Sequence, residues 1–335
     1  MAAGRRRLGR RGPSVPRVGL GLWQLGGRLW GPAGLEEALE VASAALELGV
    51  ALFDTAELYG MGRSERLLGE ALRRLGGLEE AFIVTKVAGF RTSWGSVRKS
   101  LEASRRRLGR TPDLVLYHWP PPVPHTACRA ARLLERAAEE GLTAYIGVSN
   151  FNAPELAEAA YCTKKYELVV DQVHYSLAHR VPENVLAPTA ASYGAALMAW
   201  GPLAKGALAG KRKADNPARA LDPVFREAAR DERLQQTLAS IASKYEASAA
   251  EVALAWLIAR GALPIPGARR RRHVESAARA AKLADTITAS DLEALDRASE
   301  RYRVRWGICY RELHWNRLIP GPLQALLYQY LLRGV

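Results

Sequence analysis

Cysteine is scarce in this chain, and long apolar runs are missing. Cys128, Cys162 and Cys309 lie far apart, and none belongs to a Cys-x-x-Cys pair. This spacing argues against a disulfide framework or a zinc knuckle and predicts a protein of a reducing compartment, the cytoplasm. No stretch reaches the roughly 18 apolar residues of a membrane-spanning helix, so we expect no membrane span.

Lysine is also scarce, although the chain is strongly basic. Only nine of the 48 Lys and Arg residues are lysines, and 34 Asp and Glu residues leave a formal net charge of +14. This charge attracts anions, among them nucleic acid, acidic lipid and phosphorylated cofactors. Residues 1–16 are expected to form a basic N-terminal arm, but this arm has no interleaved aromatic residues and no recognition helix, so no specific nucleic-acid partner is expected. Arginines spread over a solvated surface are the alternative interpretation.

Several motifs of other enzyme classes are absent. Gly19-Leu-Gly21 lacks the third glycine of a dinucleotide-binding fingerprint, and the segment 206–211 has the wrong spacing for a phosphate-binding loop. There is no His-Glu-x-x-His motif, and His174 with His179 has no carboxylate in metal-ligand spacing. We therefore expect neither a Rossmann domain nor a bound metal.

Short apolar runs alternate with segments of helical period, which predicts parallel strands with crossover helices. Segment 35–48 ends at Gly49, segment 64–75 ends at Gly76, and two later helices begin with capping-box spacings, Ser248 with Glu251 and Ser290 with Glu293. Eight such units predict an α/β protein with one (β/α)8 TIM barrel over residues 17–301, and an open doubly wound sheet is the alternative. The eight predicted strands are 17–23, 50–54, 81–86, 113–118, 143–149, 168–173, 195–200 and 262–265.

Polar residues follow the apolar runs at the predicted strand ends. Asp54 ends the second strand, Lys86 the third and His118 the fourth, and Tyr59 lies five residues after Asp54. The C-terminal strand ends of a barrel meet at one rim, so we expect these four side chains to converge there. Ser149, Asn150 and Gln172 end the next two strands at the same rim.

This set of side chains suits proton transfer to a carbonyl oxygen. A free tyrosine has a pKa of about 10, and a neighbouring ammonium favours its phenolate and lowers that pKa. Asp54 can hold Lys86 charged, and a neutral His118 can donate a hydrogen bond to the carbonyl. The sequence shows no Ser, Cys or metal site in a nucleophilic arrangement, so a cofactor is expected to deliver hydride.

Over nearly its whole length the sequence resembles the aldo-keto reductase family. The segment 54–65, Asp-Thr-Ala-Glu-Leu-Tyr-Gly-Met-Gly-Arg-Ser-Glu, matches the signature loop of that family. Further similar segments follow in order: Val84-Thr-Lys86, Tyr117-His-Trp-Pro120, Gly147-Val-Ser-Asn-Phe151, Gln172, Tyr175-Ser-Leu177, Trp200-Gly-Pro-Leu203 and Ile265-Pro-Gly267. The family fold is a (β/α)8 barrel, as the strand count predicts.

The resemblance implies a role for each residue at the rim. Tyr59 would be the general acid, Lys86 and Asp54 would tune it, and His118 would orient the carbonyl. Ser149, Asn150 and Gln172 would hold the nicotinamide carboxamide. Trp200 would stack on the nicotinamide ring, and Trp23 would line its other side.

The resemblance also implies where the rest of the cofactor binds. Gly201, Pro202, Leu203 and Lys205 would approach the pyrophosphate. Gly267, Arg269, Arg270 and His273 would surround the adenosine, and an arginine on the 2′-phosphate favours NADPH, with NADH also allowed. Four positions depart from the family pattern: Ser276 and Ala277 replace a Glu-Asn pair, His273 replaces arginine or glutamine, and Asp171 replaces asparagine.

The expected activity is reduction of a small-molecule aldehyde or ketone, by a monomer or a homo-oligomer. A cofactor-binding regulatory or sensor protein and a sugar-phosphate enzyme of unrelated chemistry are the alternatives. Residues 302–335 contain Trp306, Tyr310, Trp315 and an apolar stretch from 323 to 332. We expect this C-terminal segment to fold over the barrel mouth as part of the same domain; packing on the flank or in a dimer is the alternative.

Overall fold

The computed structural model describes residues 4–27, 30–304 and 316–333. Eight parallel strands form one sheet in sequence order, and backbone hydrogen bonds from Gly19 to Pro264 (3.0 Å) and from Gly21 to Pro266 (2.9 Å) join its two edges. The sheet is therefore closed, which confirms the (β/α)8 barrel and excludes the open sheet. The strands are β3 (Leu20–Gly21), β4 (Leu52–Asp54), β5 (Phe82–Val87), β6 (Leu114–Tyr117), β7 (Tyr145–Ser149), β8 (Leu168–His174), β9 (Ala196–Trp200) and β10 (Leu263–Pro264).

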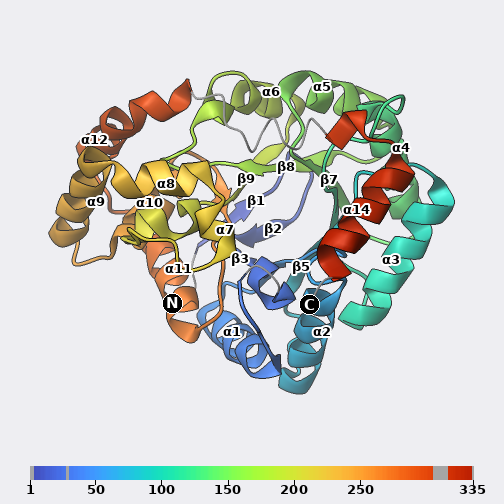
Figure 1. Cartoon of the computed structure of the whole chain (residues 1–335), viewed down its shortest axis with the longest axis horizontal. Coiled ribbons are helices and arrows are strands. Elements are labelled where there is room, and N and C mark those ends of the chain that lie inside the picture. The colour runs from blue at the N-terminus through green and yellow to red at the C-terminus, as the bar shows by residue number, and fades with distance from the viewer. Residues whose placement is uncertain (1–3, 28–29, 305–315, 334–335) are drawn as a thin grey trace.

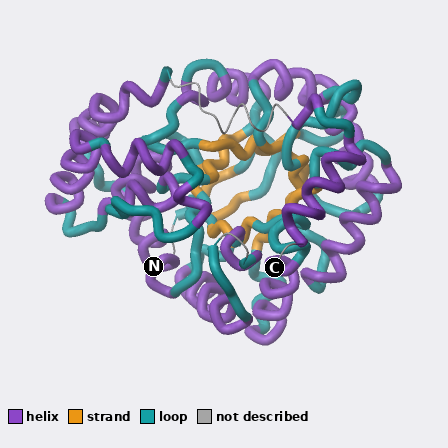
Figure 2. Tube along the Cα trace, viewed as in Figure 1, coloured by secondary structure: helices purple, strands orange, loops and turns teal. Residues whose placement is uncertain are grey.

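Helices surround the strands on all sides (Figures 1 and 2). Gly49 and Gly76 end α1 and α2 in the left-handed conformation, as predicted. The cap predicted at Ser290 is wrong, because Thr288 accepts the hydrogen bond from the Asp291 amide instead. The helices are α1 (Leu35–Leu48), α2 (Arg63–Leu75), α3 (Trp94–Leu108), α4 (Ala127–Glu139), α5 (Ala153–Cys162), α6 (Leu186–Tyr193), α7 (Pro217–Ala220), α8 (Pro223–Arg230), α9 (Glu232–Lys244), α10 (Ala249–Ala259), α11 (Arg271–Leu283), α12 (Ala289–Ser299) and α14 (Gly321–Arg333).

The N-terminal residues form an antiparallel hairpin of β1 (Arg5–Arg7) and β2 (Ser14–Pro16). Leu8 and Val15 are fully buried in the same apolar cluster as residues of the barrel strands. Figure 1 places both strands inside the ring. Because Arg6 donates to the carbonyl of Gly261, just before β10, the hairpin covers the N-terminal end of the barrel and leaves the C-terminal end open.

A disulfide joins Cys128 to Cys162, with a Cα–Cα distance of 5.3 Å, so the expectation of no disulfide was wrong. The pair is 34 residues apart in sequence, but α4 and α5 pack side by side and bring the start of one helix to the end of the other (Figure 1). This bond removes the argument for a reducing compartment. Among the described helices, none combines the length and the apolar character that a bilayer crossing requires.

The described part of the C-terminal segment lies along one side of the barrel mouth, where α14 runs beside α3 and α4 in Figure 1. It contacts the loop after β6: the Val123 amide donates to the Arg317 carbonyl (2.9 Å), and the Trp119 indole donates to the Gln324 side chain (3.4 Å). Trp306, Tyr310 and Trp315, on which the sequence prediction also depended, lie outside the described residues.

Candidate active site

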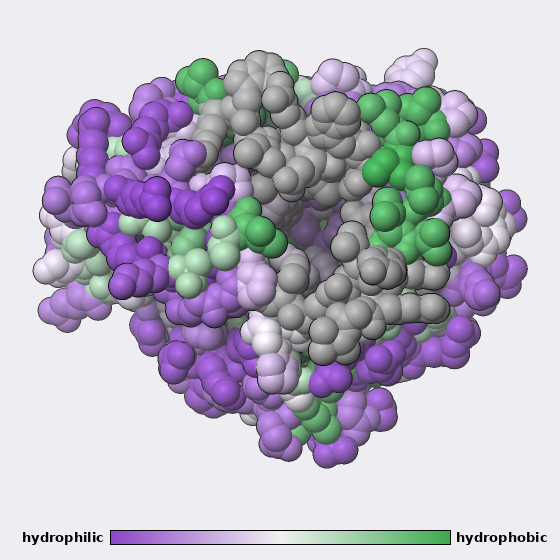
Figure 3. All heavy atoms as spheres, in the orientation of Figure 1, coloured by the Kyte–Doolittle hydropathy of each residue, from purple (hydrophilic) through white to green (hydrophobic). Residues whose placement is uncertain are grey.

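A cleft of about 1030 Å³ opens at the C-terminal ends of the strands, where Figure 3 shows the face hollowed at its centre. It runs from Tyr59 and His118 to Arg269 and His273, so one cavity joins both ends of the predicted site. Most of the predicted site residues line it: Trp23, Asp54, Tyr59, His118, Ser149, Asn150, Gln172, Trp200, Gly201, Pro202, Leu203, Lys205, Gly267, Arg269 and His273. Lys86 and Arg270 are not in its lining.

Lys86 lies behind the cleft wall and connects two of the other predicted catalytic side chains. Its ammonium donates to Asp54 Oδ2 (2.7 Å), to the Tyr59 hydroxyl (3.0 Å) and to the Thr55 carbonyl (2.9 Å). The side chains of Lys86 and Asp54 are 0% and 2% exposed. The structure thus brings Asp54, Lys86 and Tyr59 together as one buried hydrogen-bonded group.

The pKa of each partner follows from this burial and charge. Burial alone would lower the pKa of Lys86, but attraction to Asp54 and Tyr59 raises it, so the ammonium stays charged. Burial raises the pKa of Tyr59 more than Lys86 lowers it. The lowered pKa of Tyr59 predicted from the sequence is wrong, because the loss of water around the phenol outweighs the nearby ammonium. Tyr59 is therefore a protonated phenol at neutral pH.

His118 lies on the other side of Tyr59, with ring centroids 5.9 Å apart. Burial lowers its pKa well below the ordinary value, and the charge of Lys86 lowers it further. The imidazole is neutral at physiological pH and carries one N–H donor. A carbonyl oxygen between the Tyr59 hydroxyl and this ring would meet two uncharged donors.

Two buried glutamates hold the loop that carries Tyr59. Glu57 accepts hydrogen bonds from the Arg91 guanidinium (2.6 Å) and from the Ala88 amide (2.8 Å), which tie this loop to the one after β5. Glu65 accepts from Thr85 (2.6 Å) and Arg107 (2.6 Å). Both glutamates belong to the signature loop, but the sequence does not indicate their roles, since their partners are distant in sequence.

Ser149, Asn150 and Gln172 form a second network along the ends of β7 and β8. Gln172 Nε2 donates to Asp54 Oδ1 (2.7 Å), and Ser149 Oγ donates to the Gln172 carbonyl (2.8 Å). Asn150 Nδ2 donates to the His118 carbonyl (2.9 Å), while its Oδ1 accepts from the Trp200 indole (2.9 Å). These amide groups are held at fixed positions by the protein itself.

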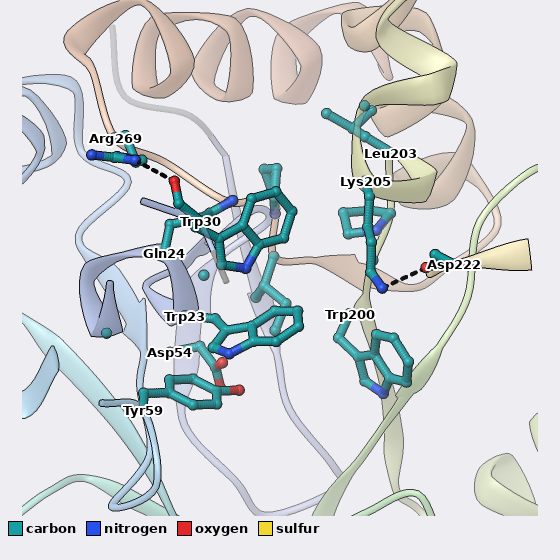
Figure 4. A pocket seen from close by; sticks show the side chains of 18 of the residues that line it. Trp23, Gln24, Trp30, Asp54, Tyr59, Trp200, Leu203, Lys205, Asp222 and Arg269 are labelled. Atoms are coloured by element: carbon teal, nitrogen blue, oxygen red, sulfur yellow. Dashed lines mark hydrogen bonds and ion pairs between the residues drawn. The ribbon is translucent and has the colours of Figure 1, made fainter. Parts of the chain in front are cut away.

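Trp23 and Trp200 stand on opposite sides of the cleft, as Figure 4 shows. Trp30 packs edge-on against Trp23, with centroids 5.5 Å apart, and also lines the cleft. Both indoles line the same cleft, and such aromatic walls suit a flat ring. The sequence did not indicate that Trp30 lines the cleft, because Trp30 lies in a glycine-rich loop, where side-chain directions follow no periodic pattern.

Basic side chains line the cleft after β9. Lys205 pairs with Asp222 (2.6 Å) and lies 5.8 Å from the centre of the Trp23 ring (Figure 4). Arg219, which was not among the residues predicted from the sequence, donates to the Lys205 carbonyl (2.7 Å) and lies over the Trp30 ring, 5.2 Å from its centre. This segment therefore spans the cleft and adds positive charge to it.

Of the consecutive arginines after β10, Arg269 lies at the edge of the cleft and Arg270 lies outside its lining. Arg269 donates to the Trp30 carbonyl (2.9 Å) and pairs with Glu37 (3.2 Å) at the edge of the cleft. Its amide donates to His273 Nδ1 (3.2 Å). Arg270 instead pairs with Glu40 (3.4 Å), and its side chain is half exposed.

The family model "Aldo/keto reductase family" matches residues 17–300. An uncharacterized oxidoreductase of Mycobacterium tuberculosis is 35% identical over 300 residues, which cover 86% of this chain and 91% of that protein. The chain belongs to the aldo-keto reductase family.

Two further proteins are similar to this aldo-keto reductase over most of its length. A methylglyoxal reductase of Escherichia coli is 32% identical over 289 residues, covering 85% of this chain and 91% of that protein. The crystal structure of an aldo-keto reductase from Klebsiella pneumoniae in complex with NADPH matches with a TM-score of 0.71 and 27% identity, covering 90% of this chain and 95% of that one.

Proposed function

We propose that this aldo-keto reductase reduces an aldehyde or ketone to an alcohol with NADPH, and that NADH can replace NADPH at lower affinity. The observation that carries the proposal is the buried contact of the Lys86 ammonium with both Asp54 and the Tyr59 hydroxyl, at the base of an aromatic cleft. The relative named methylglyoxal reductase supports an aldehyde substrate.

Tyr59 is the proposed general acid. As the carbonyl carbon accepts hydride, negative charge develops on the oxygen, and the Tyr59 hydroxyl gives it a proton. Lys86 stabilises the phenolate left behind, and Asp54 keeps Lys86 charged at 2.7 Å. His118, neutral and buried, donates a hydrogen bond that orients the carbonyl.

The cleft suits a dinucleotide phosphate in both size and chemistry. Its inner half has the indoles of Trp23 and Trp200 for a flat ring, and its outer half has Lys205, Arg219 and Arg269 for phosphate groups. When bound, the reduced nicotinamide supplies the hydride. Gln172 and Asn150 would then hold the carboxamide while keeping their bonds to Asp54 and Trp200, and Ser149 would support both.

Arg269 and His273 are proposed to contact the 2′-phosphate at the outer end. Gly201, Pro202 and Leu203 would follow the pyrophosphate, with Gly267 beside the adenosine. Arg270 is assigned no direct contact with the cofactor and acts only as a distant positive charge, because it lies outside the cleft lining and is paired with Glu40.

Titration with NADPH and NADH, followed by tryptophan fluorescence, tests the cofactor, and a panel of simple aldehydes then tests turnover through nicotinamide absorbance. We expect tight NADPH binding and turnover. Tyr59→Phe should lower kcat by at least about 100-fold and leave NADPH affinity unchanged, because only the proton donor is lost. Binding without turnover of any aldehyde would favour the sensor function, and retained turnover in Tyr59→Phe would refute the proposed acid.

A further inference from the structure

Three aromatic rings form one stack at the end of β8 and β9. His174 and Trp200 end these two strands and are paired across them. Their ring centroids lie 4.3 Å apart, with 10° between the planes. His179 stacks on the opposite face of His174, at 4.4 Å and 10°. The order of the stack is therefore His179, His174, Trp200.

The backbone on both sides fixes the two histidines. Ser176 and His179 exchange two backbone hydrogen bonds (3.0 and 3.1 Å), and this tight turn brings His179 back onto His174. Gly201 follows Trp200 with φ of +62°, and a Cβ there would lie 3.0 Å from His174 Cδ2. His174 and His179 are 4% and 1% exposed, so neither ring has room to turn away from the stack.

Trp200 is held at its edge as well as on its face. The indole donates to Asn150 Oδ1 (2.9 Å), and Asn150 Nδ2 donates to the carbonyl of His118 (2.9 Å). The hydrogen bond fixes the position of the indole nitrogen but still allows the ring to tilt about that point. Contact with His174 over the ring face removes this tilt.

We propose that His174 is a positioning residue that sets the plane of Trp200 and, through it, the plane of the bound nicotinamide ring. This inference rests on the proposed function, because it needs NADPH in the cleft. Trp200 lies across the cleft from Trp23 in Figure 4, while His174 packs on its face with ring centroids 4.3 Å apart. Without His174 the indole gains freedom to tilt, and the hydride-bearing ring loses its defined distance to a carbonyl beside Tyr59 and His118.

The test compares two ligands on wild type, His174→Ala and His174→Phe. NADPH contacts the stack through its nicotinamide, whereas adenosine 2′,5′-bisphosphate has no nicotinamide and reports the outer half of the cleft alone. We expect His174→Ala to weaken NADPH by about 2- to 10-fold, the range of a lost aromatic pair, to lower kcat, and to leave the bisphosphate unchanged. His174→Phe should restore NADPH affinity and kcat, because a flat ring is kept. His125→Ala is the matched control, a histidine outside the cleft lining.

Three outcomes would overturn the inference: equal weakening of both ligands by His174→Ala, no change for either ligand, or a loss for NADPH that His174→Phe does not repair. If His174→Ala does not fold by circular dichroism, His174→Leu takes its place, since it fills the volume without a flat ring. Failure of the wild type to bind either ligand would instead refute the proposed function, and the inference with it.

Discussion

Removing Lys86 should cost both stability and activity, and the two losses can be separated. Lys86→Met keeps an unbranched side chain but leaves Asp54, 2% exposed, without its cationic partner. Breaking a buried ion pair from one side costs about 3–5 kcal/mol of unfolding free energy. The lost hydrogen bonds to Thr55 and Tyr59 belong to the same change. A loss of this size is a large part of the roughly 5–15 kcal/mol that stabilises a typical domain.

Denaturant unfolding followed by circular dichroism measures this loss, and Lys86→Met combined with Asp54→Asn is the control. The double variant has no buried charge at the pair, so it should recover much of the stability while reduction stays abolished. A single variant as stable as wild type, or a double variant no more stable than the single one, would refute the argument.

The same variant predicts the sign of a pH effect. Burial raises the pKa of Asp54, and Lys86 opposes this rise. Without Lys86 the folded protein binds the Asp54 proton at higher pH than the unfolded chain does. The stability deficit of Lys86→Met should therefore shrink as pH falls from neutrality and grow as pH rises. A deficit independent of pH would mean that Asp54 is not the source of the loss.

Three further predictions concern proton transfer, cofactor choice and the disulfide. Because burial raises the pKa of Tyr59, kcat for reduction should stay level through neutral pH and fall only above about pH 10, and a fall near neutrality in a pH–rate profile would contradict this. Arg269→Ala should weaken NADPH binding by about 10-fold or more and NADH binding only a little, whereas Arg270→Ala should change neither affinity. Titration of both variants with both ligands checks this. Equal weakening of NADPH and NADH by Arg269→Ala would show that Arg269 does not contact the 2′-phosphate. Replacing Cys128 and Cys162 with serine should lower the unfolding free energy by about 4 kcal/mol, the chain-entropy value for a loop of this length. A reductant should lower the unfolding free energy of the wild type to that of the serine variant and leave the variant unchanged.

The barrel could be predicted because the buried strands are mostly apolar runs and several helices end at a glycine or begin at a side-chain cap. The eight observed strands fall at the eight predicted places, although β3 and β10 have only two residues each. Segment 17–23 is apolar along most of its length, but only Leu20 and Gly21 pair in the sheet, since ladder length depends on the neighbouring strand. The cap at Thr288 was missed because serine and threonine two residues apart both suit that position.

The positions of the site residues at strand ends could also be predicted, and what joins them could not. Asp54 and Lys86 meet because parallel strands end at one rim, which topology requires. The contact of Glu57 with Arg91 depends on loops that leave no periodic pattern. His174 and Trp200 are partners in adjacent strands, but the stacking of their rings depends on rotamers. The disulfide was missed for the same reason, since its geometry comes from helix packing and not from spacing.

Asp54 connects the proposed proton-transfer group with the proposed cofactor-binding group. Its Oδ2 accepts from Lys86, which serves Tyr59, and its Oδ1 accepts from Gln172, which is proposed to hold the cofactor. One carboxylate thus holds both Lys86, the partner of the proposed proton donor, and Gln172, the proposed partner of the cofactor. Both contacts are 2.7 Å long and Asp54 is 2% exposed, so a displacement of Asp54 is expected to disturb Lys86 and Gln172 together. The ends of β4, β5 and β8 are therefore joined through one buried carboxylate.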